Sequence, residues 1–296
     1  MKLSSTITAV SVALLSALSS TAQAQAPLTG PVLQQVVISG HRLRFNGTLT
    51  DPAIVRYILI DPGNADPTTD GFTPLERIAV LVLYIGGNGT MGFTPGQVNT
   101  GSPNTVARNR NHLAAEGFVV AVVDAADDFN ARSNGLSGRR LGPQHLEDLR
   151  AVMADLRSRY PNLPIWAVGH SRGTLSATVT ALHVDPPADG LVLLSSLTGD
   201  PAIPSEDLSA LDVESIRSPA LIVSHQGDLC AFTNPDDSRA LRKRFVVSER
   251  AKFRDFNGGS APLSDPCDPL APHGFFGIDQ KVIEAIAKWI KHREEP

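Results

Sequence analysis

Apolar positions along the chain gather in short runs that alternate with amphipathic stretches. The runs are continuous rather than alternating, which is typical of strands buried on both faces of a sheet. They lie at residues 78–85, 118–123, 165–168, 191–194, 220–224 and 253–256. Stretches with helical spacing follow or separate them, at residues 103–116, 144–160, 174–182, 235–245 and 278–290. This order predicts an α/β fold: a mostly parallel central sheet flanked by helices on both faces.

The N-terminal part of the chain has a different pattern. Residues 36–38, 43–49 and 55–60 alternate or run apolar, and Gly40, Asn46-Gly47 and Pro52 separate them. Such short segments with turn residues between them favour antiparallel strands at one edge of the sheet. Residues 61–74 and 124–140 are polar loops, and residues 198–218 leave room for no more than a small flap.

The first residues have the features of a secretory signal peptide. Lys2 is followed by the mostly apolar residues 7–18, too few to span a bilayer, and by Ala22-Gln23-Ala24 as a small-residue cleavage site. We expect removal of residues 1–24, a periplasmic or secreted protein, and a single α/β domain over residues 25–296. No later stretch is apolar enough to predict a stable membrane span, and a net charge of −4 argues against nucleic acid as a partner.

The two cysteines, Cys230 and Cys267, are expected to form a disulfide in an exported protein. Their spacing is not that of a metal site, and nothing in the sequence predicts a metal or another cofactor.

One apolar run ends abruptly in Gly-His-Ser-Arg-Gly at residues 169–173, and an amphipathic stretch follows. Strand, Gly-x-Ser-x-Gly and helix form the context of a nucleophile elbow, in which Ser171 projects from a strained turn. Glycines two residues before and after avoid a collision across that turn. The alternative is an ordinary turn in which Ser171 only caps the helix.

A serine nucleophile needs a base and an acid that orients the base. Asp228 follows the run at 220–224 and is the first choice of acid, ahead of Asp200; His273 lies in the loop before the last helix and is the first choice of base. His170 is expected to point away from the serine, His225 to support the turn of Asp228, and His145 to lie in an outer element. A bridge between Cys230 and Cys267 would tie the acid loop to the base loop.

A glycine cluster at residues 86–89 follows the first buried run. Backbone N–H groups there, from Gly87 or Asn88, together with the N–H of Arg172, are expected to form an oxyanion hole. The charged side chain of Arg172 suggests pairing with Asp124 or Asp127.

Together, these motifs resemble the α/β-hydrolase superfamily over residues 78–290. The resemblance implies Ser171 as nucleophile, Asp228 as acid, His273 as base, and an oxyanion hole from Arg172 with Asn88 or Gly87. Gly86 stands where many members have His before Gly, and no large cap insertion is present, which looks more like an open-sited esterase. We therefore expect a serine hydrolase that cleaves a small-molecule carboxylic ester through an acyl-enzyme. The alternatives are a peptidase of the prolyl-oligopeptidase type, although no propeller domain precedes the core, and a non-catalytic binding protein.

Overall fold

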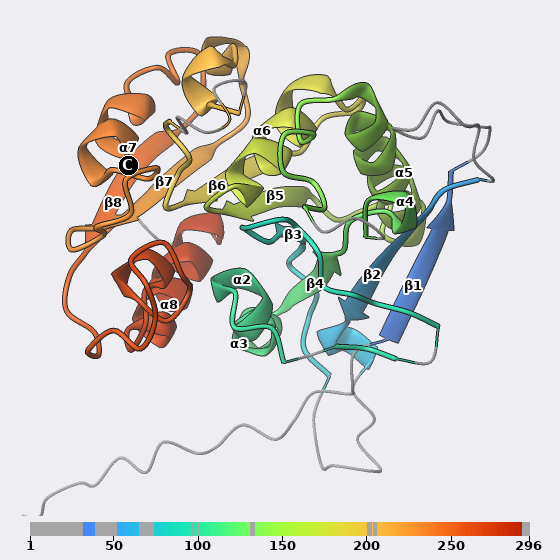
Figure 1. Ribbon diagram of the computed structural model, residues 1–296. Helices are drawn as coiled ribbons and strands as arrows, with labels where there is room; N and C mark the ends of the chain where they lie inside the picture. Colours follow the sequence, from blue (N-terminus) through green and yellow to red (C-terminus); the bar gives the residue numbers. More distant parts are fainter. Residues whose placement is uncertain are drawn as a thin grey trace, which may run out of the picture.

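The computed structural model describes residues 32–38, 52–64, 74–95, 97–99, 101–130, 134–199, 203 and 206–291. These residues contain one eight-stranded sheet with the strand order β1-β2-β4-β3-β5-β6-β7-β8 (Figure 1). The strands are β1 (Val32–Val37), β2 (Ile54–Ile60), β3 (Ala79–Tyr84), β4 (Phe118–Val123), β5 (Ile165–His170), β6 (Gly190–Leu194), β7 (Ala220–His225) and β8 (Ala251–Phe256).

The sheet has two parts that match the two hydrophobic patterns. From β4 through β3, β5, β6 and β7 to β8 every neighbouring pair is parallel. At the other edge β1 pairs with β2, and β2 with β4, in the antiparallel sense. The predicted mostly parallel sheet with antiparallel N-terminal strands is therefore confirmed.

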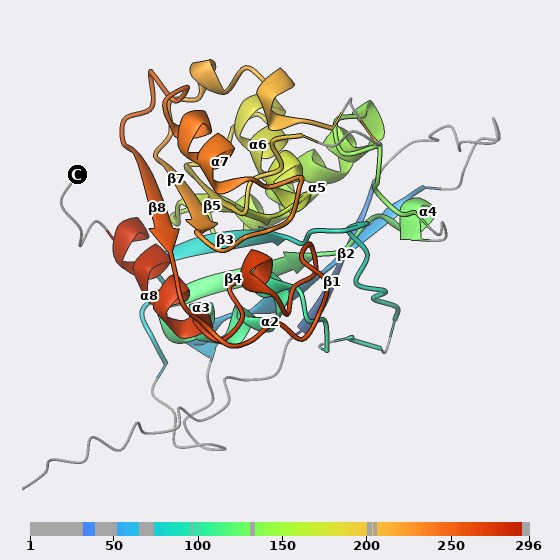
Figure 2. The ribbon, with the colours of Figure 1, turned by 60° about the vertical axis from the view of Figure 1, so that its left-hand side comes forward.

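Helices cover both faces of the sheet (Figure 2). On one face, α5 (Pro143–Arg159), α6 (Gly173–His183) and α7 (Pro235–Arg242) contribute to one apolar cluster with the strands. On the other, α2 (Thr105–Arg108), α3 (Arg110–Ala115) and α8 (Asp279–Ile290) contribute to a second. The short elements are α4 (Asp127–Asn130), η1 (Pro62–Asn64), η2 (Leu208–Ala210), η3 (Val213–Ser215) and η4 (Pro272–Gly274). The central strands β3, β4 and β5 are buried at every position because both faces are covered.

The helix predicted for residues 103–116 is wrong in one respect, because the chain forms two short helices that meet at Asn109. The Asn109 amide group donates to the Thr105 carbonyl (2.9 Å) and to Asp279 Oδ1 (2.7 Å). An asparagine side chain that bonds to the backbone favours a helix end over a helix interior. The loop expected at residues 124–140 likewise contains the short helix α4.

Several predictions concern residues outside the described ranges. They include the signal peptide at residues 1–24, the strand at residues 43–49, and Asp200 as the second choice of acid. Within the described ranges, no helix combines the length and the hydropathy that a membrane span requires.

Candidate active site

The loop between β5 and α6 places Ser171 in a strained backbone conformation, with φ of +55°. The two glycines of the motif have close neighbours. A Cβ on Gly169 would lie 2.4 Å from the Gly173 carbonyl oxygen, and one on Gly173 would lie 2.1 Å from the Tyr84 carbonyl oxygen. No side chain fits at such distances, so both positions require glycine and the serine remains at the tip of the turn.

Residues 86–89, here called the glycine turn, lie directly beside the serine. The Gly89 N–H donates to the Gly86 carbonyl (3.2 Å), and Gly87 has φ of +59°. A Cβ on Gly86 would lie 2.9 Å from the Ser171 Cβ. Among the described residues, none accepts a hydrogen bond from the N–H of Gly87 or of Asn88, which leaves these donors available to a ligand.

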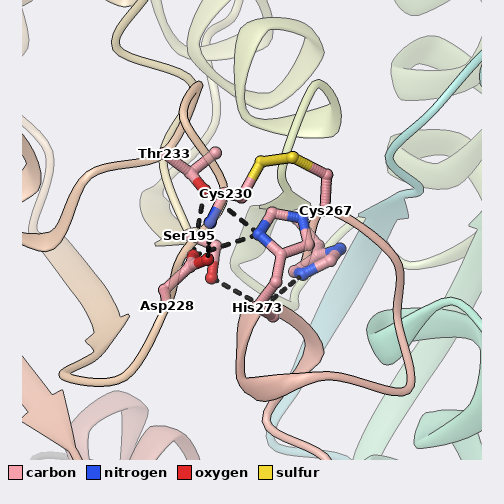
Figure 3. The surroundings of a disulfide bond; sticks show 7 residues. Ser195, Asp228, Cys230, Thr233, Cys267 and His273 are labelled. Carbon is pink, nitrogen blue, oxygen red and sulfur yellow. Dashed lines mark hydrogen bonds and ion pairs between the residues drawn. A yellow bond between two sulfur atoms is a disulfide. The ribbon is translucent and has the colours of Figure 1, made fainter. Parts of the chain in front are cut away.

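Asp228 and His273 form a buried pair (Figure 3). The Nδ1 atom of His273 lies 3.0 Å from Oδ2 of Asp228, and the two side chains are 1% and 0% exposed. A carboxylate only accepts hydrogen bonds, so the neutral imidazole carries its proton on Nδ1 and leaves Nε2 as an acceptor. The Cys230 N–H donates to the other oxygen of Asp228 (2.9 Å), which fixes the carboxylate.

Thr233 also contacts this pair, and sequence reasoning did not single it out. Its hydroxyl donates to Asp228 Oδ2 at 2.9 Å and lies 3.1 Å from His273 Nδ1. Thr233 follows Asp228 by five residues in the loop after β7, and no local motif marks it.

The carbonyl of His273 is held from two sides. His170 Nε2 lies 3.0 Å from this oxygen, and the Ser195 hydroxyl donates to it at 2.8 Å. Burial and the neighbouring His273 lower the pKa of His170 well below its usual range, so the ring is neutral. Since a carbonyl only accepts, the proton lies on Nε2. His170 is thus turned toward the loop of His273, where the prediction was only that it points away from the serine.

The rings of His170 and His273 have centroids 4.8 Å apart, which places His273 next to the residue that precedes Ser171. No direct hydrogen bond joins Ser171 and His273, which both lie in the part of the chain that the structure describes. Such contacts are often long in a free enzyme and shorten when substrate binds.

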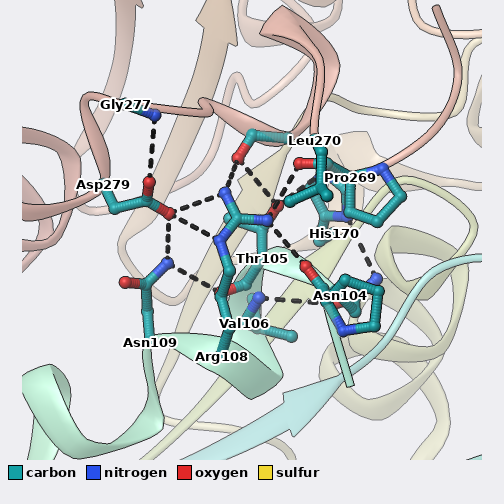
Figure 4. Close-up of polar contacts among 12 residues, drawn as sticks. Asn104, Thr105, Val106, Arg108, Asn109, His170, Pro269, Leu270, Gly277 and Asp279 are labelled. Atoms are coloured by element: carbon teal, nitrogen blue, oxygen red, sulfur yellow. Dashed lines mark hydrogen bonds and ion pairs between the residues drawn. The ribbon is translucent and has the colours of Figure 1, made fainter. Parts of the chain in front are cut away.

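Arg108 of α2 holds the base loop from outside (Figure 4). Its guanidinium donates to the carbonyls of Pro269 (2.9 Å) and Gly274 and to Asp279 Oδ1 (2.8 Å). The Thr105 hydroxyl adds a hydrogen bond to the Gly274 carbonyl (3.0 Å). These residues belong to elements more than 160 positions away from the loop, so sequence reasoning did not associate them with the site.

A disulfide joins Cys230 to Cys267, with their Cα atoms 4.6 Å apart (Figure 3). Cys230 is two residues beyond Asp228, and Cys267 is six before His273. The bridge therefore connects the acid loop after β7 to the base loop after β8.

The predicted pairing of the Arg172 side chain with Asp124 or Asp127 is wrong. Arg172 contacts neither Asp124 nor Asp127; its guanidinium pairs with Glu206 at 2.8 Å. Asp124 instead accepts from the backbone of Met91 and Phe93, and Asp127 from the backbone of Ile54. The hypothesis relied on charge alone and overlooked these nearer backbone donors.

The expectations for His145 and His225 agree with the structure. His145 lies on α5 but is only 4% exposed, because α5 packs against α6. His225 accepts from the Gly227 N–H at 2.9 Å, within the turn that leads to Asp228. No group of three or more His, Cys, Asp or Glu side chains in the described part of the chain is arranged to hold a metal ion.

The sheet order, the serine on a strand-to-helix turn and the buried imidazole–carboxylate pair define the class: an α/β hydrolase. A family model described as serine aminopeptidase, S33, matches residues 104–254, just over half of the chain. The chain therefore belongs to this family of serine α/β hydrolases. No curated protein matches the sequence.

Solved structures with this fold include esterases and peptidases. The carboxylesterase EstE1, from a metagenomic library, is 15% identical with a TM-score of 0.55 and covers 92% of each chain. Est1E from Butyrivibrio proteoclasticus is 16% identical with a TM-score of 0.54, covering 86% of this chain and 98% of its own. A putative dipeptidyl aminopeptidase IV from Bacteroides ovatus is 15% identical with a TM-score of 0.53, covering 88% of this chain but 36% of its own. At such identities the likeness establishes the fold alone.

Proposed function

We propose that the protein hydrolyses carboxylic esters through an acyl-enzyme, with Ser171 as nucleophile, His273 as base and Asp228 as the acid that orients the base. The observation that carries the proposal is the buried His273–Asp228 contact of 3.0 Å beside a serine with φ of +55°. A solvent-exposed loop histidine would need no buried carboxylate partner. A serine that only caps a helix would need no strained backbone.

The proposed reaction begins when His273 Nε2 removes the proton from the Ser171 hydroxyl as the oxygen attacks the ester carbonyl. The tetrahedral oxyanion accepts hydrogen bonds from the N–H of Arg172 and from an N–H of the glycine turn, Gly87 or Asn88. His273 then gives its proton to the departing alcohol, which leaves the acyl group on Ser171. Water attacks the acyl-enzyme with His273 again as the base, and Asp228 stabilises the imidazolium at each stage.

Ester rather than peptide hydrolysis is supported by the extent of the structural matches. The carboxylesterase EstE1 and Est1E correspond to this chain over nearly their whole length, whereas the dipeptidyl aminopeptidase corresponds over 36% of its own. The family description, serine aminopeptidase, favours a peptidase as the second candidate. The same three residues would serve both reactions, so the leaving group decides between them.

A substrate panel tests this proposal. p-Nitrophenyl esters of increasing acyl length and aminoacyl p-nitroanilides are offered to the purified protein and to Ser171→Ala. Ester turnover that Ser171→Ala lacks supports the esterase, and anilide turnover with little ester turnover would point to the peptidase. A protein that turns over neither and resists a fluorophosphonate probe is the non-catalytic binding protein.

We further propose that the protein is exported, with cleavage after Ala24 and one folded domain over residues 25–296. The disulfide supports export because such bonds persist in oxidising compartments. Expression of the full chain in a bacterium, followed by intact mass measurement of the periplasmic fraction, tests it. A mature mass that begins at Gln25 is the expected result, and an unprocessed chain confined to the cytoplasm would contradict export.

A further inference from the structure

Arg140 is a fully buried arginine between the glycine turn and the helix that follows Ser171. The residue as a whole is only 1% exposed. Nη2 donates to the carbonyls of Ile85 (3.0 Å) and Gly87 (3.2 Å), and Nη1 donates to the Ser176 hydroxyl of α6 (2.7 Å). One guanidinium therefore joins the backbone of the turn to the elbow helix.

The two carbonyls that Arg140 binds determine where the neighbouring N–H groups point. In a planar trans peptide, the C=O and the N–H of the same unit point in opposite directions. Holding the Gly87 carbonyl toward Arg140 therefore turns the Asn88 N–H away from it, and holding the Ile85 carbonyl does the same for the Gly86 N–H. The carbonyls that face Arg140 thus orient the N–H groups of Gly86 and Asn88. The turn that carries them borders Ser171 at Gly86.

An arginine suits this position for a geometric reason. Three acceptors on two different elements require donors that diverge from a rigid plane, which the guanidinium fork supplies and a lysine ammonium does not. Burial lowers the pKa of Arg140 to about 10, so the group stays charged at neutral pH. Glu206 places a negative charge near this arginine: its Oε1 accepts from the Arg140 backbone N–H (3.1 Å), while Oε2 pairs with Arg172 (2.8 Å).

A chain of buried polar side chains fixes the far end of the contact. Ser176 accepts from Arg140, so its own proton is free to be donated to His145 Nε2, 2.9 Å away. His145 Nδ1 lies 3.6 Å from Asp148 Oδ2, which is beyond hydrogen-bond distance. The hydrogen bonds from Arg140 to Ser176 and from Ser176 to His145 tie the guanidinium to α6 and α5.

We infer that Arg140 is a positioning residue for the oxyanion hole: it orients the backbone N–H groups of Gly86 and Asn88 in the turn beside Ser171. This inference rests on the ester hydrolysis proposed above. Arg140 touches no reacting atom in this scheme, and its contribution comes through the backbone that it holds. Misplacing such donors by about 1 Å lowers the rate by up to about 100-fold.

The test compares Arg140→Met and Arg140→Lys with Arg157→Met as the matched control. Arg157 lies on α5 and donates to Pro187 O and Asp189 Oδ2 near the first residue of β5, whereas the glycine turn follows the last residue of β3. We expect kcat for an ester to fall at least about tenfold in Arg140→Met with KM within about threefold of wild type. Arg140→Lys should recover part of the loss, and Arg157→Met should keep the wild-type kcat.

Two further readouts separate positioning from general damage. A trifluoromethyl ketone, which forms a tetrahedral adduct with the serine, should lose affinity in Arg140→Met in parallel with kcat. Deuterium uptake of a peptide spanning residues 85–90 should rise in Arg140→Met and not in Arg157→Met, and this readout needs no substrate. If the wild-type protein shows neither ester turnover nor fluorophosphonate labelling, the proposed function is refuted. The deuterium uptake of residues 85–90 still decides whether Arg140 holds the turn.

Wild-type kcat and inhibitor affinity in a folded Arg140→Met, or unchanged deuterium uptake in an inactive protein, would overturn the inference. If Arg140→Met does not fold, Arg140→Lys decides by the same measurements, since it keeps the buried charge.

Discussion

The two sides of the site are built in different ways. The nucleophile side is built from segments that follow one another in the chain: β5, the elbow and α6. The glycine turn after β3, the strand that pairs with β5, lies next to them. The base side uses loops after β7 and β8, and it is held by a disulfide, by Arg108 and by the His170 and Ser195 contacts to one carbonyl. The first depends on glycines packed against backbone, with Arg140 joining the turn to α6, and the second depends on several separate long-range contacts.

The comparison shows why the two sides should fail differently. A backbone held by close packing has no tolerance for an extra atom, so changes there should damage the fold itself. A loop held by several separate contacts can lose one and stay near its place, so changes there should reduce activity or stability in steps. Four changes, taken from the largest expected effect to the smallest, sharpen or break this distinction.

Asp228→Asn addresses the chemistry of the base side without changing its shape. An amide in place of the carboxylate removes the charge that stabilises the imidazolium and favours the wrong tautomer of His273. We expect kcat to fall by about 10⁴-fold with little change in KM. Asp236→Asn, in the first turn of α7, is the control and should retain full activity. A kcat for Asp228→Asn within tenfold of wild type would remove Asp228 from the mechanism.

Gly173→Ala tests the packing of the nucleophile side. Its Cβ would lie 2.1 Å from the Tyr84 carbonyl and 2.8 Å from the Ile85 carbonyl, and backbone atoms cannot rotate away. We expect a loss of more than about 4 kcal/mol in the free energy of unfolding, measured by urea denaturation. Gly199→Ala, where a Cβ meets nothing within 4 Å, is the control. A stable Gly173→Ala protein would show that the elbow relaxes more readily than its contacts imply.

Removing the disulfide tests the tether of the base side. The double change Cys230→Ser and Cys267→Ser releases a loop with a sequence separation of 37 residues. In the chain-entropy model this lowers the free energy of unfolding by about 4 kcal/mol. We also expect a lower kcat, because the acid and base loops lose their covalent link. If reduced and oxidised protein have the same melting temperature and kcat, the bridge does not hold these loops together.

The His170 contact should appear as a dependence of stability on pH. Its pKa in the folded protein is well below that of the unfolded chain, about 6.5, so the unfolded state binds more protons as the pH falls. Stability from this group is present above about pH 6.5 and falls by up to about 1.4 kcal/mol per pH unit below it. His170→Gln keeps a donor toward the His273 carbonyl and removes the titration, so urea denaturation between pH 7 and 5 should show a smaller loss. An equal loss in both proteins would contradict the assignment.

The sequence patterns predicted the regular parts of this molecule because those parts depend on local order. Continuous apolar runs specify strands buried on both faces, and the elbow follows from five consecutive residues. The break at Asn109 was missed because one of the two acceptors of its side chain, Asp279, lies 170 positions away. Thr233, Arg108, Arg140 and Glu206 were missed for the same reason: each is polar, and only the folded chain brings it to the site. Pairing by charge failed for Arg172 because nearby backbone N–H groups already bind Asp124 and Asp127.

The central claim is that folding brings the hydroxyl of Ser171, the imidazole of His273 and the carboxylate of Asp228 into one path for a proton. The most direct measurement is the rate and site of fluorophosphonate labelling in wild type, Ser171→Ala and His273→Gln, read by intact mass and peptide mapping. We predict one adduct on Ser171 in wild type, none in Ser171→Ala, and labelling at least about 100-fold slower in His273→Gln. An adduct on another residue, or equal labelling rates in wild type and His273→Gln, would contradict the claim.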